Sequence, residues 1–289
     1  MNTKSEVRAA AAAVAGAHHR RTGRNGQDAA AAWTGVVPGV APGAAAGAAG
    51  AAAEAAGAVV VCDGCSAGQS SEVGARLGAE LVIAAAAREL LRGARAAEIW
   101  PAVQEHVLGA LDRLAAAMPG DRARVVREHL LFTIVAAAYR GDEVAVWVVG
   151  DGAYALGDRA RVLGPFPDNQ PPYLAYALLG AAAPAPRPHT ELADARCGSV
   201  LVATDGAAEV GLDAFGDTRR YLHNPDALRR HLTVLARGDE RIDWDGRRVE
   251  RRAAALQDDG AVALLAWSPQ PRSQLPSQPR LPSAPGAAS

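Results

Sequence analysis

The order of the predicted elements indicates a mixed α+β fold with mainly antiparallel sheets. Strands come first, followed by two helices, a run of strands, and a final helix and strand. This order is not the strict strand–helix alternation of a doubly wound parallel sheet. Gly141-Asp142, placed between two apolar runs, adds a hairpin signal. The 289 residues can bury a substantial core, and we place a single domain at residues 1–267.

The first half of the chain is predicted to contain three strands and two helices. Ser70-Ser71-Glu72 is a helix-start pattern, with a hydroxyl cap followed by an acid in the first turn. Residues 18–26 are a polar, basic connection, and residues 38–57 are a Gly/Ala/Pro-rich stretch that predicts an enlarged loop inserted in the domain. The strands are expected at 7–17, 28–37 and 58–62, and the helices at about 70–92 and 97–117.

The second half is dominated by short β-branched runs. A proline-rich stretch at 165–188 predicts an irregular flap, and the Pro/Ser-rich tail at 268–289 predicts disorder. The helices are expected at 226–236 and, as a weaker candidate, 247–256. The strands are expected at 130–139, 143–149, 153–156, 161–163, 199–203 and 261–267.

Composition excludes several classes of protein. The net charge of −1 gives no general attraction to nucleic acid or to an anionic membrane, and no run is apolar enough to span a bilayer. Three cysteines do not make a disulfide framework, which favours a reducing compartment. Lys4, Arg8 and the following alanines imitate a signal peptide but lack leucine and phenylalanine. We therefore expect a cytoplasmic protein.

Five segments carry an aspartate beside a glycine or at the end of an apolar run. Such an Asp-Gly is often only a turn, but five of them spread along the chain are better explained by one shared site. Carboxylate oxygens are ligands for hard divalent ions such as Mg²⁺ and Mn²⁺, and two such ions about 4 Å apart can activate a water and bind a phosphoryl oxygen. No nucleophile-elbow, zinc-protease or Walker motif competes. The aspartates are Asp28, Asp63, Asp151, Asp205 and Asp258.

The order of these motifs resembles that of the metal-dependent protein phosphatases, the type 2C serine/threonine family. It is most similar to a bacterial branch whose first motif is Gly-x-x-His followed after a short gap by Gln-Asp. Each motif alone is weak, but five in the right order over residues 7–267 are specific. They are Gly16-Ala17-His18-His19 with Gly26-Gln27-Asp28-Ala29, Asp63-Gly64-Cys65-Ser66-Ala67-Gly68, Gly150-Asp151-Gly152-Ala153-Tyr154, Thr204-Asp205-Gly206, and Asp258-Asp259.

The resemblance implies a four-layer α-β-β-α sandwich with two central, mainly antiparallel sheets. It also implies that Asp63 bridges two Mn²⁺ or Mg²⁺ ions and that the carbonyl of Gly64 helps to bind one of them. Asp205 and Asp258 would hold the other ion. Asp28 would orient a metal-bound water, and the bridging hydroxide would attack phosphorus in line.

Two further expectations concern weaker metal ligands. Asp151, together with Asp205, would form a weaker third metal site. Gln27 stands where many members of the family have glutamate. Its amide oxygen can still bind a cation, but without charge, so that metal would be held more loosely. Glutamine is usual in the branch that this chain resembles, so the substitution does not by itself imply inactivity.

The chain also departs from the family pattern at the residue that binds the phosphate group of the substrate. Gly23 stands where the family has a phosphate-binding arginine. Arg20, Arg21 or Arg24 could supply the guanidinium, and His18 could assist; the sequence does not choose among them. Cys62 and Cys65 form a Cys-x-x-Cys that could be half a zinc site or a redox pair. The reading we prefer is a buried Cys62 and a Cys65 that lines the site.

The sequence thus predicts a Mn²⁺/Mg²⁺-dependent phosphoserine/phosphothreonine protein phosphatase. Its partner would be a phosphoprotein linked to a bacterial serine/threonine kinase, with no nucleic acid and no membrane. Two alternatives remain open at this stage. One is a catalytically weak or inactive pseudophosphatase that serves as a binding module, and the other is a phosphohydrolase that acts on small molecules.

Overall fold

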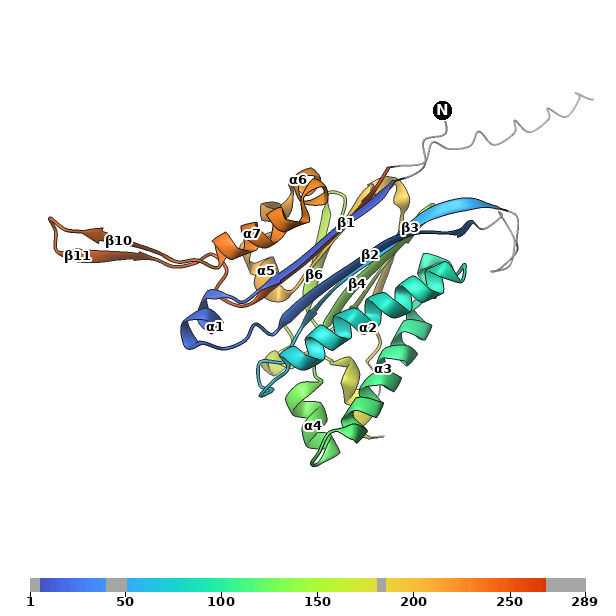
Figure 1. The fold of residues 1–289 in the computed structure, drawn as a ribbon, viewed down its shortest axis with the longest axis horizontal. Coiled ribbons are helices and arrows are strands. Elements are labelled where there is room, and N and C mark those ends of the chain that lie inside the picture. The colour runs from blue at the N-terminus through green and yellow to red at the C-terminus, as the bar shows by residue number, and fades with distance from the viewer. Residues whose placement is uncertain (1–5, 40–50, 181–185, 269–289) are drawn as a thin grey trace, which may run out of the picture.

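A computed structural model describes residues 6–39, 51–180 and 186–268. The elements follow one another through two sheets and their covering helices (Figure 1). The strands are β1 (Val7–Val14), β2 (Asp28–Gly39), β3 (Ala51–Asp63), β4 (Ile134–Arg140), β5 (Glu143–Val149), β6 (Gly152–Leu156), β7 (Arg159–Leu163), β8 (His189–Asp194), β9 (Ser199–Ala203), β10 (Asp239–Asp243), β11 (Arg248–Arg252) and β12 (Gly260–Trp267). The α-helices are α1 (Ala17–Thr22), α2 (Glu72–Leu91), α3 (Trp100–Ala117), α4 (Arg122–His129), α5 (Asp205–Val210), α6 (Thr218–His223) and α7 (Pro225–Leu235).

Two five-stranded antiparallel sheets form the centre of the molecule. The first has the strand order β1-β12-β9-β6-β7, and the second has the order β2-β3-β4-β5-β8. In Figure 1, α2 and α3 lie on one side of the sheets, and α6 and α7 lie on the other. This arrangement confirms the predicted α+β class and the four-layer sandwich.

Strand side chains alternate between the faces of each sheet and thereby build three apolar layers. In β3, Val60 packs toward α2 and α3, whereas Val59 and Val61 face the other sheet. In β12, Ala263 faces the other sheet, whereas Leu264 packs toward α6 and α7. The three layers fill the two helix–sheet interfaces and the sheet–sheet interface, so the aspartates at the strand ends are held by rigid elements.

Several element predictions were incomplete or wrong. The connection at 18–26 contains α1, and α4 and β8 were not predicted. The strands extend into the predicted loop insertion at both ends, since β2 runs to Gly39 and β3 starts at Ala51. The centre of that insertion and the tail beyond Ser268 lie outside the described residues, so the predicted domain limits stay a prediction.

The candidate helix at 247–256 is wrong. Residues 248–252 form β11, which pairs with β10 in a separate two-stranded sheet. Val249 is the one apolar residue among 248–252, so the sequence gives no two-residue period here, and pairing with β10 determines the strand. Over the described parts of the chain, no helix combines the length and hydrophobicity needed to cross a bilayer.

Candidate active site

The ends of the central strands bring the predicted aspartates together. Asp28 starts β2 and stands opposite Asp63, the last residue of β3, in the strand register. Their carboxyl groups share a hydrogen bond. Asp151 follows β5, and Asp205 follows β9 at the first position of α5. The two sheets therefore place four of the predicted ligands at one edge of the sandwich.

Burial, together with neighbouring carboxylate charges, raises the pKa values of these four carboxyl groups. Burial, with the nearby charges of Asp259 and Asp205, raises the pKa of Asp28 to about 8, although hydrogen bonds from its neighbours oppose the shift. Burial and the charges of Asp28, Asp205 and Asp151 raise the pKa of Asp63 well above its usual value. Burial and Asp205 raise that of Asp151 to about 6. Carboxylates that repel one another in this way need a positive counter-charge in order to ionise together.

Asp258 reaches the cluster from the loop before β12. Burial raises the pKa of Asp205, and the charge of Asp258 raises it further. Two glycines pack against the backbone of this loop. A Cβ on Gly16 would overlap the carbonyl of Asp258, and a Cβ on Gly206 would overlap the carbonyl of Asp259. The close approach of both backbones explains why glycine is needed at these two positions.

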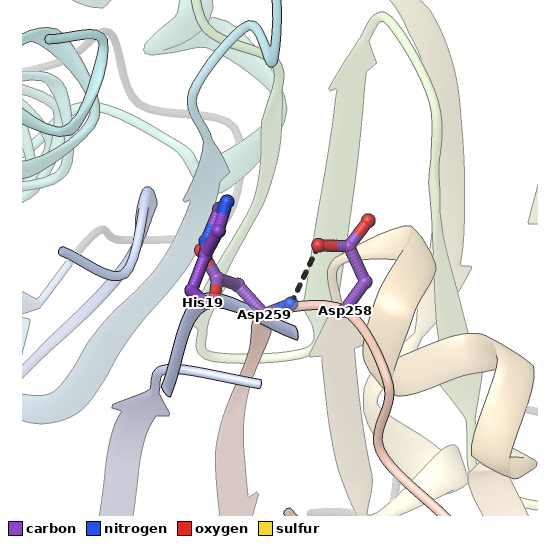
Figure 2. Close-up of side chains that lie close together, drawn as sticks. All are labelled: His19, Asp258 and Asp259. Carbon is purple, nitrogen blue, oxygen red and sulfur yellow. Dashed lines mark hydrogen bonds and ion pairs between the residues drawn. The ribbon is translucent and has the colours of Figure 1, made fainter. Parts of the chain in front are cut away.

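Asp259 is a buried residue beside the cluster, and its carboxylate holds three groups from the start of the chain in place. Its carboxylate accepts hydrogen bonds from the backbone N–H of Gly16 at 2.8 Å and from that of Gln27 at 2.5 Å. His19 Nδ1 lies 2.8 Å from Asp259 Oδ2, and Figure 2 shows the two side chains together, with the Asp258 carboxylate apart from them. Asp259 thus ties the start of α1 and the Gln27-Asp28 segment to the loop that carries Asp258.

His19, Asp258 and Asp259 also have the spacing of a metal site. Both carboxylate oxygens of Asp259, however, already accept hydrogen bonds from the donors around them. We therefore interpret His19 and Asp259 as residues that position the ligands rather than as ligands. His19 is the fourth residue of the Gly16-Ala17-His18-His19 motif. The motif was therefore a signal for this residue, but its positioning role was not predicted.

Thr204 connects Asp28 to the strands β9 and β12. Its Oγ1 donates a hydrogen bond to Asp28 Oδ2 at 2.6 Å and accepts one from the N–H of Ala261 at 2.9 Å. The side chain is 1% exposed, so this bond is shielded from water. It fixes the Asp28 carboxylate relative to β9 and β12. The Thr-Asp-Gly motif contained this residue, but its role required the folded chain.

Gln27 is buried and points its amide at the start of α2. Its Nε2 donates to Ser71 Oγ at 2.6 Å. Glutamine is the donor in this bond, whereas a glutamate at position 27 would have to accept from the Ser71 hydroxyl. The bond uses the amide nitrogen, so the metal-binding role of the amide oxygen stays a prediction.

The candidate phosphate-binding residues lie on and after α1. His18, Arg20, Arg21 and Arg24 are all exposed. Gly23 ends α1 with φ +68°, in the left-handed region that an arginine rarely adopts. The shape of this turn explains why arginine is absent at position 23 and leaves the choice among its neighbours open.

The cysteines are free. Cys62 is buried and Cys65 is half-buried, and Tyr173 Oη is hydrogen bonded to Cys65. Burial and the charges of Asp28 and Asp63 raise the pKa of the Cys62 thiol, which keeps it protonated and a poor nucleophile. These features fit the preferred reading of two cysteines that pack at the edge of the site.

The donor set suits a divalent cation. The clustered groups are carboxylates, and hard divalent ions bind such oxygen ligands. The mutual repulsion described above would be relieved by a cation between the carboxylates. The residues present therefore fit the metals that the sequence predicts.

Comparisons with known proteins agree with this fold. The sequence profile of the family described as Protein phosphatase 2C matches residues 15–241. The match covers well over half of the chain, so the protein belongs to the protein phosphatase 2C family, a class of protein serine/threonine phosphatases. The match stops within β10, before Asp258. The suspected family is thus confirmed.

Solved structures of similar fold include the catalytic domain of the serine/threonine protein phosphatase PstP in complex with two manganese ions. It is 16% identical, with a TM-score of 0.53, and the alignment covers 91% of this chain and 99% of that one. An arginine-to-glutamate variant of a bacterial serine phosphatase is 13% identical, with a TM-score of 0.51 and the same coverage. At such identities the likeness supports the fold. A search of curated proteins found no match.

Proposed function

We propose that this protein is a Mn²⁺- or Mg²⁺-dependent phosphoserine/phosphothreonine protein phosphatase. The observation that carries the proposal is the convergence of Asp28, Asp63, Asp151 and Asp205 at one edge of the sandwich, with Asp258 in the loop beside them. Burial and neighbouring charges raise the pKa values of the first four. Two bound divalent ions would supply a water of lowered pKa and a positive charge for the phosphoryl oxygens. Hydrolysis would then be direct, without a phosphoenzyme.

In this proposal, different aspartates would hold different metal ions. Asp63 would be a ligand of both ions, the carbonyl of Gly64 would help to hold one of them, and Asp205 and Asp258 would hold the other. Asp151, with Asp205, offers a third and weaker site. A PstP catalytic domain of the same fold holds two manganese ions, which supports two ions as the expected number here.

Asp28 would orient the attacking water. Its carboxylate is held by Thr204 and shares a hydrogen bond with Asp63, so its position is fixed before substrate binds. Arg20, Arg21, Arg24 and His18 are the candidates for binding the phosphate from the exposed side of the site. We expect the substrate to be a cytoplasmic phosphoprotein, phosphorylated by a bacterial serine/threonine kinase.

A substrate panel tests this function. Phosphoserine and phosphothreonine peptides should be hydrolysed in Mn²⁺ at least tenfold more efficiently, in kcat/KM, than nucleotides or sugar phosphates. Similar efficiencies on both groups would instead support a phosphohydrolase for small molecules. Inorganic phosphate release is a suitable readout for all of these substrates.

A second candidate is a binding module that keeps the fold and has lost catalysis. The neutral amide of Gln27, where many family members have glutamate, and the glycine at position 23 favour it. Calorimetric titration with Mn²⁺ separates the two, because the phosphatase requires at least two bound ions and a binding module would show one weak site or none. Gln27→Glu is then the informative variant, since it restores a negative charge beside Asp28.

A further inference from the structure

The hairpin of β10 and β11 stands away from the body of the protein (Figure 1). We call residues 239–252 the arm. Its two strands pair only with each other. An isolated two-stranded hairpin in water is at best marginally stable, and the arm adds nothing to the three apolar layers of the sandwich. The family match ends at residue 241, so most of the arm lies beyond it.

One face of the arm is apolar and open. Ile242 and Val249 stand opposite each other in the register, so their side chains share a face. They are 50% and 53% exposed. Trp244 follows Ile242 by two residues, at the start of the turn, and is 79% exposed. Exposed tryptophan beside aliphatic residues is typical of protein-binding surfaces.

The opposite face is held by its own ion pairs. Arg248 Nε lies 3.0 Å from Asp243 Oδ2, and Arg248 Nη2 lies 3.0 Å from Glu250 Oε1. The turn is closed by the N–H of Gly246, which donates to Asp243 Oδ1 at 3.0 Å. These contacts order the hairpin through its charged side and leave the apolar side free for a partner.

The segment that follows the arm, residues 256–258, connects it to the candidate active site. Leu256, which is fully buried, donates its N–H to Leu235 of α7, and its carbonyl accepts from the N–H of Ala17 in α1 at 3.1 Å. The next carbonyl, of Gln257, accepts from the N–H of His18 at 3.0 Å. Asp258 follows immediately, so the arm rises beside α1 at the edge of the aspartate cluster.

The helix α1, whose backbone is hydrogen bonded to the segment that follows the arm, is basic. Arg20, Arg21 and Arg24 are exposed on and after α1, and within the described parts of the chain none of their guanidinium groups is in an ion pair. Such a surface attracts an acidic polypeptide. In a two-fold symmetric contact through this surface, a second copy would oppose its own arginines to these and be repelled.

We propose that the arm docks the segment of a phosphoprotein substrate that flanks its phosphorylated residue. Apolar side chains of that segment cover Ile242, Val249 and Trp244, and acidic side chains lie over the arginines of α1. The proposal rests on the proposed phosphatase function and adds to it a recognition surface for acidic, partly apolar phosphoproteins. Since each strand of the arm is about 17 Å long, a small phosphate ester cannot reach its tip.

The test compares substrates that can and cannot touch the arm. Wild type, Trp244→Ala and Val249→Ser are assayed in Mn²⁺ on phosphorylated β-casein and on p-nitrophenyl phosphate. We expect kcat/KM on casein to fall about tenfold or more in Trp244→Ala, mainly through KM, with p-nitrophenyl phosphate turnover within twofold of wild type. Val162→Ser, at another exposed valine in the edge strand β7, is the matched control and should leave both activities unchanged.

Two kinetic outcomes overturn the proposal. Equal losses on casein and p-nitrophenyl phosphate would make the arm a structural support of the site. Unchanged casein kinetics in both arm variants would leave the arm without a role in recognition. A wild-type dimer that Trp244→Ala converts to a monomer in light scattering would assign the apolar face to a second copy and also overturn it.

Failure of the phosphatase function itself gives a different pattern, with no turnover of either substrate by wild type. In that case, the affinity of the protein for phosphorylated β-casein, measured by calorimetry, tests the docking role of the arm without relying on catalysis. We expect the affinity to fall about tenfold or more in Trp244→Ala and to stay unchanged in Val162→Ser. Equal affinities of wild type and Trp244→Ala would overturn the docking role.

Discussion

His19 and Asp259 lie 240 positions apart in the sequence, and their side chains meet at 2.8 Å from Nδ1 to Oδ2. Both side chains are buried. The same carboxylate holds the N–H groups of Gly16 and Gln27. The pair therefore joins the first motif of the chain to the last and sets the position of the neighbouring Asp258.

We predict that His19→Ala lowers both activity and Mn²⁺ affinity by about 10- to 100-fold, the usual range for residues that position metal ligands. The fold should persist, because the three apolar layers are untouched. Activity assays with calorimetric Mn²⁺ titration check this. His106→Ala in α3, which contacts Arg88 away from the aspartates, is the control. Wild-type metal affinity in His19→Ala would contradict the positioning role.

A second prediction concerns Gln27 and Ser71. Ser71→Ala removes the buried partner of the Gln27 amide, and an unpaired buried polar group costs about 1–3 kcal/mol. Urea denaturation should show a loss of that size. Gln27→Met combined with Ser71→Ala should be more stable than the sum of the two single losses implies, because no unpaired group remains. Strict additivity in this double-mutant cycle would mean that the bond contributes nothing.

The glycines that contact the Asp258-Asp259 loop give a third prediction. Gly206→Ala places a methyl group on the carbonyl of Asp259, so the loop must shift and carry Asp258 with it. We expect activity to fall at least tenfold, because metal-ligand geometry tolerates little displacement. Gly109→Ala in α3 meets only the end of the Arg113 side chain at 3.5 Å. It should leave activity unchanged and increase stability by about 0.5–1 kcal/mol.

The aspartate cluster predicts an unusual pH dependence in metal-free protein. The pKa of Asp28 is about 8 in the fold, against 3.8 ordinarily, so the folded state holds this proton more tightly than the unfolded state. Its contribution to stability is full below about pH 4 and is lost as the pH rises through about 8. Asp151, with a pKa of about 6, shifts in the same direction.

Melting temperatures of EDTA-treated protein between pH 5 and 9 check this prediction. Wild type should lose stability relative to Asp28→Asn as the pH rises, because the variant lacks the titrating carboxyl. Mn²⁺ should raise the melting temperature more at pH 8 than at pH 5. A difference between wild type and variant that does not change with pH would contradict the assigned pKa.

The sequence predicted the parts of this structure that depend on local pattern. The apolar runs at 143–149 and 199–203 are strands at the predicted positions, and the aspartates at strand ends converge because the sheets bring those ends together. The first seven residues of β3, 51–57, were not predicted as strand because none of them is β-branched. The arm was missed because its alternating apolar residues are few and exposed.

Contacts between distant segments could not be read from the sequence. His19 is the histidine of the Gly-x-x-His motif, but only the fold shows that it is buried on Asp259 while His18 is exposed. The hydrogen bond from Thr204 to Asp28 spans 176 positions. The Gln27–Ser71 bond likewise depends on where α2 begins. Such partners follow from the three-dimensional arrangement of the sheets, which no local period encodes.

Hydrolysis of p-nitrophenyl phosphate by wild type and Asp63→Asn, in Mn²⁺ and in EDTA, tests the central claim most directly. Because Asp63 is buried among other carboxyls that raise its pKa, the neutral amide should not destabilise the fold, and the loss can be assigned to the site. We predict Mn²⁺-dependent turnover in wild type that disappears in EDTA and in Asp63→Asn. Turnover that persists in folded Asp63→Asn, or its absence from folded wild type at high Mn²⁺, would contradict the account.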